Sequence, residues 1–290
     1  MAILVTGAAG LVGRAAVAAL LRQGVEHVRA VVREPTQVGD LRRLGAKAAL
    51  LDATDPDGLA AAMDGVFTAC SLTGGLWPRP GEDPYASVVE PARVFLAAAA
   101  AARVRRVVVC SPAAVGHAAP GNPHLAAKAE VERMVAASGL EHVILRCTHV
   151  LGPGARLLAL LAPGGPGQGP VLVPGDGRQR VAPVWVGDVA DAIAAADDAA
   201  ELGAVTWSVA GPTRLTFDGL VDAAHGARVA KHHLGTGDGR WLSEAQVGVL
   251  AADSLGDPAL PAPPGLVPTP LAEALARSAA LERSRVAGPP

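Results

Sequence analysis

The sequence is poor in aromatic residues, in cysteine and in net charge. Only 3% of its 290 residues are Phe, Trp or Tyr, while 50% are apolar, so the core must be built from Ala, Val and Leu. The formal net charge of −2 provides no basic surface of the kind that binds nucleic acid. Three cysteines without a pairing pattern argue against a disulfide framework and favour a reducing, cytoplasmic compartment.

No segment predicts a membrane span or an export signal. The Ala-rich run at residues 95–102 is too short to cross a bilayer and is flanked by Arg93 and Arg103. The first residues lead directly into an apolar run, without a charged leader. We therefore expect a cytoplasmic monomer or homodimer that acts on a small-molecule substrate and binds neither nucleic acid nor membrane.

A glycine-rich turn near the amino terminus is the strongest motif in the sequence. The apolar residues 2–5 predict a buried parallel strand, which is followed by TGAAGLVG at residues 6–13 and by a helical stretch ending near Gln23. Strand, glycine-rich turn and helix in this order predict a site for the pyrophosphate of a dinucleotide. The residues expected to contact the cofactor here are Thr6, Gly7, Gly10, Leu11, Val12 and Gly13.

Each glycine of this turn has an expected role. Gly7 permits the tight turn, Gly10 lets the backbone approach the pyrophosphate, and Gly13 lets the helix pack close to the strand. The unpaired N–H groups and the positive dipole end of the helix would face the phosphates. The alternative is a glycine-rich turn without a ligand, which the strand and helix around it make the weaker interpretation.

Segments typical of strands and helices alternate over the first 150 residues. We expect strands at 27–33, 48–51, 66–72, 106–110 and 143–147, and helices at 55–63, 85–102 and 122–139. This alternation predicts an α/β protein with a Rossmann-type, doubly wound parallel sheet in the order 3-2-1-4-5-6. The expected domains are an NADP-binding domain at 1–150, with a return segment near 184–210, and a smaller C-terminal substrate-binding lobe formed by 151–183 and 211–290.

The end of the second strand predicts the choice of cofactor. Arg33 stands about 20 residues beyond the glycines, where an NAD-binding unit has an acid that bonds the ribose 2′-hydroxyl. The forked donors of a guanidinium match a 2′-phosphate, so the sequence favours NADP(H), with NAD(H) as an alternative; Arg14 is a second candidate. Two other interpretations stay open. Glu34 would face the ribose if the strand ended one residue later, or Arg33 would be a solvated surface residue.

Five later segments resemble one protein superfamily, in the same order along the chain. They lie at residues 44–55, 104–111, 138–146, 176–190 and 210–216 and include the stretches LDATD, VVVCS, ILR, VGDVA and AGP. With the TGxxGxxG spacing, they resemble the atypical and extended short-chain dehydrogenase/reductases, in particular the NmrA-like NAD(P)-binding family. The resemblance covers roughly the first 220 residues and departs from the family at Cys147, where a proline is usual.

The resemblance implies further cofactor contacts. Asp52 with Ala53 would lie at the rim of the adenine site, although Asp52 also suits a turn or a helix cap. The backbone of Leu72 and Thr73 would meet the middle of the cofactor. Lys128 matches the family's lysine, which holds the nicotinamide ribose hydroxyls; the alternative is a solvated helix lysine.

The catalytic positions depart from the family pattern. The Tyr-x-x-x-Lys pair reads HLAAK at residues 124–128, so the spacing of four is kept on one helix face but His124 replaces the tyrosine. The family's Ser/Thr position aligns loosely with Ala114, and Ser111 is the nearest hydroxyl. His124, with an ordinary pKa near 6.5, is a candidate proton donor; Lys128 and water are alternatives, and His124 could also be a polar first-turn residue without a role.

Two aromatic residues are candidates for the substrate pocket. Trp77 and Tyr85 lie in and after the Gly/Pro-rich loop at residues 73–84, at the carboxyl end of the fourth strand. They could line the pocket, or they could only fasten a long loop.

The remaining chemically reactive side chains predict no further site. Cys70, Cys110 and Cys147 each fall near the carboxyl end of one of three neighbouring strands. Small buried core residues are the favoured interpretation, and a redox-sensing cluster is the alternative. No metal site is expected, because His232 and His233 lack partners at ligand spacing.

These features together predict an oxidoreductase. The lost tyrosine disfavours a nucleotide-sugar epimerase or dehydratase, whereas a reductase needs only a hydride donor and some acid. We expect an NADP(H)-dependent reductase of a small carbonyl, enone or quinone-like substrate. The first alternative is a non-enzymatic NADP(H)-sensing regulator of the NmrA-like type, and the second is an accessory subunit that holds a nucleotide structurally.

Overall fold

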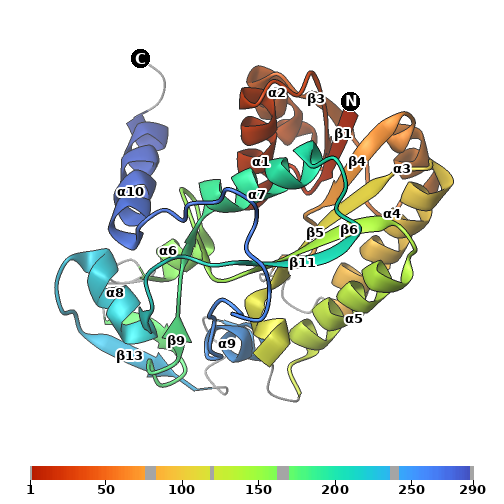
Figure 1. The fold of residues 1–290 in the computed structure, drawn as a ribbon. Helices are drawn as coiled ribbons and strands as arrows, with labels where there is room; N and C mark the ends of the chain where they lie inside the picture. Colours follow the sequence, from red (N-terminus) through yellow and green to blue (C-terminus); the bar gives the residue numbers. More distant parts are fainter. Residues whose placement is uncertain (1, 76–82, 118–120, 162–169, 236–241, 288–290) are drawn as a thin grey trace.

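A seven-stranded sheet forms the centre of the protein in its computed structural model, which describes residues 2–75, 83–117, 121–161, 170–235 and 242–287. The strand order is β11-β6-β5-β4-β1-β2-β3, and every neighbouring pair is parallel (Figure 1). The strands are β1 (Ala2–Thr6), β2 (His27–Val32), β3 (Lys47–Leu50), β4 (Val66–Ser71), β5 (Arg106–Pro112), β6 (Glu141–Cys147) and β11 (Ala204–Val209). This order confirms the predicted Rossmann-type sheet and adds β11 at its β6 edge.

Helices cover both faces of the sheet, as a doubly wound fold requires. One face packs against α1 (Leu11–Arg22), α2 (Pro35–Leu44) and α7 (Val186–Asp198), and the other against α3 (Pro56–Met63), α4 (Glu90–Ala101) and α5 (Pro123–Ala137). The buried clusters on the two faces consist mainly of Ala, Val, Leu and Ile, with Trp207 in one and Phe95 in the other. The core is therefore mainly aliphatic, as the scarcity of aromatic residues in the composition indicates.

The first residues expected for two of the helices, Asp55 and Asn122, are their N-caps. Asp55 caps α3 by accepting a hydrogen bond from the backbone N–H of Gly58, at 3.1 Å. Asn122 caps α5 by accepting from the backbone N–H groups of His124 and Leu125, at 3.0 and 3.1 Å. Each cap is followed by a proline at the first helical position, where its missing N–H costs nothing.

The structure differs from the predicted elements at two places near the cofactor edge. The strand expected at 27–33 ends at Val32, and α2, which the sequence pattern did not indicate, begins two residues after Arg33. The helix expected at 85–102 starts with a π-helical segment, η1 (Tyr85–Val89), before α4 begins. Pro91 accounts for this wider turn, because it has no N–H to close an α-helical bond.

A smaller lobe lies beyond the carboxyl ends of β5, β6 and β11 (Figure 1). It contains α6 (Arg156–Leu161), β8 (Val171–Pro174), β9 (Arg180–Val181), β12 (Leu215–Thr216), α8 (Phe217–His225), β13 (Lys231–Leu234) and α9 (Glu244–Leu250), around one apolar cluster. The short strands β7 (Val150–Leu151) and β10 (Val184–Trp185) pair where the chain passes between the sheet and the lobe.

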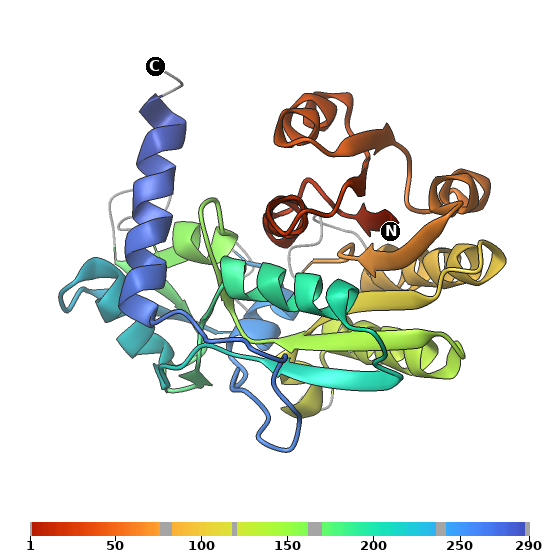
Figure 2. The same cartoon turned by 45° about the horizontal axis from the view of Figure 1, so that its top comes forward.

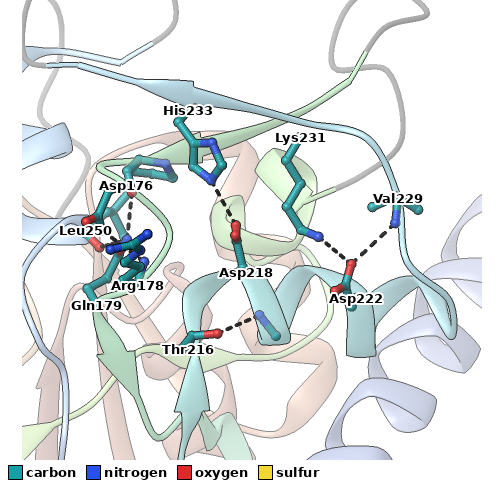
Figure 3. A network of polar contacts seen from close by, with 12 residues as sticks. Asp176, Arg178, Gln179, Thr216, Asp218, Asp222, Val229, Lys231, His233 and Leu250 are labelled. Atoms are coloured by element: carbon teal, nitrogen blue, oxygen red, sulfur yellow. Dashed lines mark hydrogen bonds and ion pairs between the residues drawn. The ribbon is translucent and has the colours of Figure 1, made fainter.

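Polar contacts hold the elements of this lobe together (Figure 3). Lys231 Nζ donates to Asp222 Oδ1 at 2.5 Å, and His233 Nε2 lies 3.1 Å from Asp218 Oδ1, so an ion pair and a histidine–carboxylate hydrogen bond join β13 to α8. Gln179 Nε2 donates to the carbonyl oxygen of Leu250 at 3.1 Å, which ties the segment before β9 to α9.

The described carboxyl-terminal region ends in a long helix. α10 (Leu271–Ala287) has 17 residues and rises beside the lobe, away from the sheet (Figure 2). Asp188 holds the segment before it by accepting from the N–H and the hydroxyl of Thr269, at 2.8 and 2.7 Å. Among the helices in the described part of the chain, none is long and apolar enough to span a bilayer.

Candidate functional site

The glycine-rich turn has a geometry that only glycine allows at two positions. Gly7 has φ +66°, and a Cβ there would lie 2.7 Å from the carbonyl oxygen of Leu72. A Cβ on Gly13 would lie 2.3 Å from the carbonyl oxygen of Gly7. Both distances are too short for any side chain, so the tight turn at Gly7 and the close packing at Gly13 are as the sequence predicts.

Gly10 differs from its two partners because the protein itself does not require a glycine there. Its φ of −70° and ψ of 172° suit any residue, and the nearest atom to an added Cβ is the Gly7 carbonyl oxygen at 3.2 Å. Gly10 is exposed and begins α1 without a side-chain cap, so the first N–H groups of the helix remain available to an anion. This cradle fits a pyrophosphate.

The other residues expected around the turn take up supporting positions. Thr6 is buried, and its hydroxyl donates to the carbonyl oxygen of Cys70 at 3.4 Å, which ties β1 to β4. Leu11 and Val12 pack against the buried Trp185, so their side chains hold the start of α1. Contacts of Leu11 and Val12 with the phosphates would come from their backbone N–H groups.

Arg33 lies beyond the end of β2, with 61% of its side chain exposed. Its Nε is 4.0 Å from Glu34 Oε1, and Glu34 itself is the N-cap of α2 in a capping box with Gln37. The alternative in which Glu34 faces the ribose required a strand that ended one residue later than expected. The strand ends at Val32 instead, so this alternative is not supported. Arg14 pairs with Asp40 of α2. Arg14 is therefore already engaged within the protein.

Asp52 follows β3 and forms a turn. Its Oδ1 accepts from the N–H and the hydroxyl of Thr54, at 2.9 and 2.7 Å. These hydrogen bonds, and to a smaller degree the charge of Arg33, lower the pKa of Asp52 below its usual range. Ala53 lies in the same turn, and the turn leaves the second carboxylate oxygen of Asp52 free of the Thr54 contacts.

Lys128 is buried on the face of α5 that meets the sheet. Only 7% of it is exposed, and its Nζ donates to the carbonyl oxygen of Thr73, just beyond β4, at 3.5 Å. Burial lowers the pKa of Lys128 to about 8, although Cys110 and Glu132 oppose this shift. Lys128 is therefore not a solvated helix lysine, and it lines a small cavity with Ser71 and Thr73.

His124 is enclosed more completely than Lys128. It is 1% exposed, and neither ring nitrogen has a hydrogen-bond partner. Burial, assisted by the charge of Lys128, lowers the pKa of His124 to about 4. At neutral pH the ring is uncharged. The sequence-based expectation of an acid with a pKa near 6.5 therefore requires correction, because α5 and its neighbours exclude water from the imidazole.

Ser111 and the nearby ion pair complete the carboxyl edge of the sheet. Ser111, on β5, is 5% exposed with an unpartnered Oγ, and it is the register partner of Arg146 on β6. Arg146 donates twice to Glu132, through Nε at 3.2 Å and Nη2 at 2.7 Å. Ala114, the other position considered for a hydroxyl, is buried in the 3₁₀ turn that follows β5.

The sequence interpretation did not include the Glu132–Arg146 pair. Glu132 is one helical turn beyond Lys128, and Arg146 belongs to the ILR stretch at residues 144–146. Glu132 is four residues after Lys128, and this spacing predicts that both side chains lie on the same face of the helix.

Of the two aromatic candidates for the substrate pocket, the structure describes Tyr85 alone, and Tyr85 does not join this cluster. Trp77 lies outside the described residues. Tyr85 begins η1 with half of its surface exposed, and it interacts with Arg93. Val88 from the same turn lines the Lys128 cavity instead.

The cysteines lie on one face of the sheet, in the apolar cluster shared with α1 and α7. Cys110 is opposite Leu145 and Cys147 is opposite Pro112, so the two cysteines are diagonal neighbours. Contact with the thiol of Cys110, together with burial, raises the pKa of Cys147, and burial raises that of Cys70. Thiols with raised pKa values are poor nucleophiles, which favours the core interpretation.

No group of three or more His, Cys, Asp or Glu in the described ranges could hold a metal ion. The candidate site consists of the glycine turn, the residues after β2 and β4, and the buried groups of α5 and β5.

Comparison with known proteins identifies the family of this site. A model described as NAD(P)H-binding matches residues 7–172, which include the glycine turn, Arg33 and Lys128. The chain belongs to this NAD(P)H-binding family. A comparison with curated proteins finds no match.

Solved structures share the fold of this NAD(P)H-binding protein over almost its whole length. UDP-glucuronic acid 4-epimerase from Bacillus cereus has a TM-score of 0.74 at 18% identity, covering 98% of this chain and 99% of the other. Triphenylmethane reductase from Citrobacter sp. has 0.74 at 17% identity, covering 96% and 99%. NADPH-dependent quinone oxidoreductase from Escherichia coli has 0.73 at 22% identity, covering 94% and 98%.

The family match confirms the cofactor class, NAD(P)H, and the solved structures confirm the Rossmann-type fold. Because the sequence identities are low, the solved structures bear on the fold alone. The NmrA-like branch, the choice between NADP and NAD, and the substrate stay predictions.

Proposed function

We propose that the protein is an NADP(H)-dependent reductase of a small carbonyl, enone or quinone-like substrate. The observation that carries this proposal is the burial of Lys128, His124 and Ser111, three polar groups that α5 and β5 bring to the carboxyl edge of the sheet. Ligands of open α/β sheets bind at this edge. NADPH, when bound, supplies a hydride, and the residues of the chain must hold the cofactor, orient the substrate and manage one proton.

The glycine turn and Lys128 would hold the two ends of the cofactor. The first N–H groups of α1 suit the pyrophosphate, and the Lys128 ammonium suits the ribose hydroxyls near the nicotinamide. With a pKa of about 8, Lys128 is a charged ammonium at neutral pH, and it is the only charged group of the three. Lys128 is therefore the proposed proton source, directly or through a ribose hydroxyl.

His124 would act as a neutral hydrogen-bond donor. An uncharged imidazole can polarise a carbonyl oxygen by donating one hydrogen bond, and it does not need to titrate near neutrality. Ser111, whose Oγ is also unpartnered, is a second donor at the same edge. The pair would stabilise the negative charge that forms on the substrate oxygen during hydride transfer.

His124→Phe is expected to lower kcat roughly 100-fold, the usual cost of losing one such donor, without changing the pH dependence of the rate between pH 6 and 7. His124→Gln should recover part of the rate, because its amide can still donate. The measurement is NADPH consumption with menadione across a pH series. If the wild-type rate falls as pH rises through 6.5, and the rate of the variant does not change over that range, His124 is instead a charged acid.

Arg33 is proposed to select NADP over NAD, because it is exposed at the end of β2 and Glu34 is engaged in capping α2. Arg33→Ala is expected to weaken NADP⁺ binding about 10- to 100-fold, which is the loss of one or two charge-assisted hydrogen bonds. NAD⁺ binding should stay nearly unchanged. Calorimetric titration with both nucleotides measures this, with the exposed Arg22→Ala as the matched control. An equal loss for both nucleotides would assign Arg33 a different role.

The regulator alternative has a specific observation in its favour, since the family's tyrosine is replaced by a buried, uncharged histidine. A turnover screen with NADPH against quinones, enones and ketones, run beside a binding titration, separates the two functions. Tight NADPH binding without turnover of any compound would favour the regulator. Very slow release of a co-purified nucleotide would favour the accessory subunit.

A further inference from the structure

The side-chain amide of Asn122 joins the smaller lobe to the start of α5. Its Oδ1 accepts from the backbone N–H groups of His124 and Leu125, and these bonds are those of an ordinary helix cap. Its Nδ2 donates to the carbonyl oxygen of Ala245 in α9, at 3.0 Å. Capping does not require this third bond, which reaches an element of the lobe 123 residues further along the chain.

The helix α9 is fixed within the lobe on its other side. Val247 and Leu250 are buried in the apolar cluster of the lobe, and Gln179 donates to the carbonyl oxygen of Leu250 (Figure 3). On the side toward α5, Val249 packs against Leu125 in a separate cluster. Because α9 lies between the core of the lobe and the start of α5, the position of the lobe is transmitted to α5 through it.

Gly248 lets the Asn122 amide lie directly against α9. A Cβ built on Gly248 would be 2.6 Å from Asn122 Nδ2, which is closer than two such atoms can approach. Apart from the backbone of α9 itself, the Asn122 side chain is the only group of the described residues within 4 Å of that position. Glycine is a poor residue for a helix interior, so the contact with Asn122 accounts for its presence here.

The position of the His124 ring depends on the backbone that Asn122 holds. The ring is 1% exposed, and neither of its nitrogens has a hydrogen-bond partner. No hydrogen bond of the ring itself therefore keeps it in place. The backbone N–H of His124 is bonded to Asn122 Oδ1 at 3.0 Å, so this bond and the surrounding packing decide where the ring lies.

We propose that Asn122 is a positioning residue of the candidate site, and that its bond to Ala245 sets the place of His124 relative to the lobe. The proposal rests on the proposed reductase function, in which His124 donates to the substrate oxygen, and on the expectation that the lobe binds the substrate. Such a donor contributes only when it points at the atom where charge forms, and a displacement of about 1 Å can lower a rate roughly 100-fold. The bond between Asn122 and α9 keeps the lobe and His124 at a fixed separation.

Two substitutions break this link from opposite sides. Asn122→Ser keeps a good cap for α5, but its side chain is too short to donate to Ala245. Gly248→Ala pushes the Asn122 amide away from α9 and leaves Asn122 present to cap α5. For each variant we expect kcat for the reduction of menadione by NADPH to fall about tenfold or more. The Kd of NADPH should stay unchanged, and the melting temperature should stay within about 4 °C of the wild type.

Matched controls make the same changes away from the lobe. Asp55→Ser alters the cap of α3, whose side-chain bond is to Gly58 within the helix. Gly39→Ala adds a Cβ in α2, where no atom lies within 4 Å. Both controls should keep the kcat of the wild type. If they lose as much rate as the two link variants, the loss is a general effect of altering a helix and the proposal is overturned.

A second comparison decides whether Asn122 acts through the imidazole. In the His124→Phe background, Asn122→Ser is expected to change kcat by less than about twofold, because the group that it positions is already gone. An equal loss in both backgrounds would show that Asn122 acts by another route, and would overturn the proposal.

The NMR signal of the His124 ring provides a test that needs no turnover. Its Cε1–H signal, assigned by its absence in His124→Phe, is expected to move in Gly248→Ala and to stay in place in Gly39→Ala. If the wild type reduces no carbonyl compound, the proposed reductase function fails, and this comparison still decides whether α9 controls the place of His124. An unmoved signal, or an unchanged kcat in both link variants, would overturn the proposal.

Discussion

Gly10→Val is expected to abolish NADP(H) binding while the protein remains folded. The backbone of Gly10 is in an extended conformation that valine adopts readily, and an added Cβ meets only one atom, at 3.2 Å. The methyl groups of the valine would instead occupy the space in front of the first N–H groups of α1, which the pyrophosphate must enter. We expect Kd to rise at least 100-fold, or about 3 kcal/mol, in a fluorescence titration with NADPH.

Two other glycines provide the controls. Gly39→Val, in α2, adds a side chain where no atom lies within 4 Å, and it should leave both binding and the melting temperature nearly unchanged. Gly13→Val would collide with the backbone of Gly7 and Ala8, so it should destabilise the fold itself. If Gly10→Val binds NADPH as tightly as the wild type, the pyrophosphate lies elsewhere.

Local patterns in the sequence predicted the sheet and the glycine-rich turn correctly. The turn at Gly7 and Gly13, the cap at Asn122 and the order of the strands each depend on residues close together in the chain or on a general rule of parallel sheets. Such features leave a direct signal in a single sequence. The helix α2 was missed although a capping box marks its start, because Gly39 lies in its interior and its single buried residue, Leu41, leaves no apolar period.

The state of the catalytic groups could not be predicted in the same way. Whether Lys128 and His124 are buried depends on β4, η1 and α9, which lie far from α5 in the sequence. Burial decides their pKa values, so the lowered pKa of His124 could not be predicted from its place on α5. The sequence indicated Asn122 as the start of a helix, but its partner Ala245 is too distant along the chain for any local pattern to reveal the contact.

The second large effect is a pH dependence that Lys128 imposes on both binding and stability. Burial lowers its pKa to about 8 in the folded protein, from the ordinary value of 10.5 for a solvated lysine. Below pH 8, Lys128 is protonated in the folded and in the unfolded chain. Between pH 8 and 10.5 the unfolded chain holds a proton that the folded chain lacks, so the contribution of Lys128 to stability rises with pH in that window.

Cofactor binding should change in the opposite direction. The charged ammonium is the better donor to the ribose and attracts the phosphates, so NADPH affinity should fall as pH rises above 8, by up to tenfold for each pH unit. Below about pH 7.5 the affinity should be flat with respect to Lys128. Titrations of NADPH at pH 7, 8 and 9, at constant ionic strength, measure this slope.

Lys128→Met removes the titrating group and separates these two effects. At pH 7 the variant should bind NADPH at least tenfold more weakly, because one charge-assisted hydrogen bond is lost. It should also be more stable, because methionine occupies the buried site without the cost of burying a charge. The slope of affinity between pH 8 and 9 should disappear.

Lys47→Met, at an exposed position on β3, is the matched control and should keep the slope of the wild type. A wild-type affinity that is flat from pH 7 to 9, or a Lys128→Met variant that retains the slope, would show that another group controls cofactor binding.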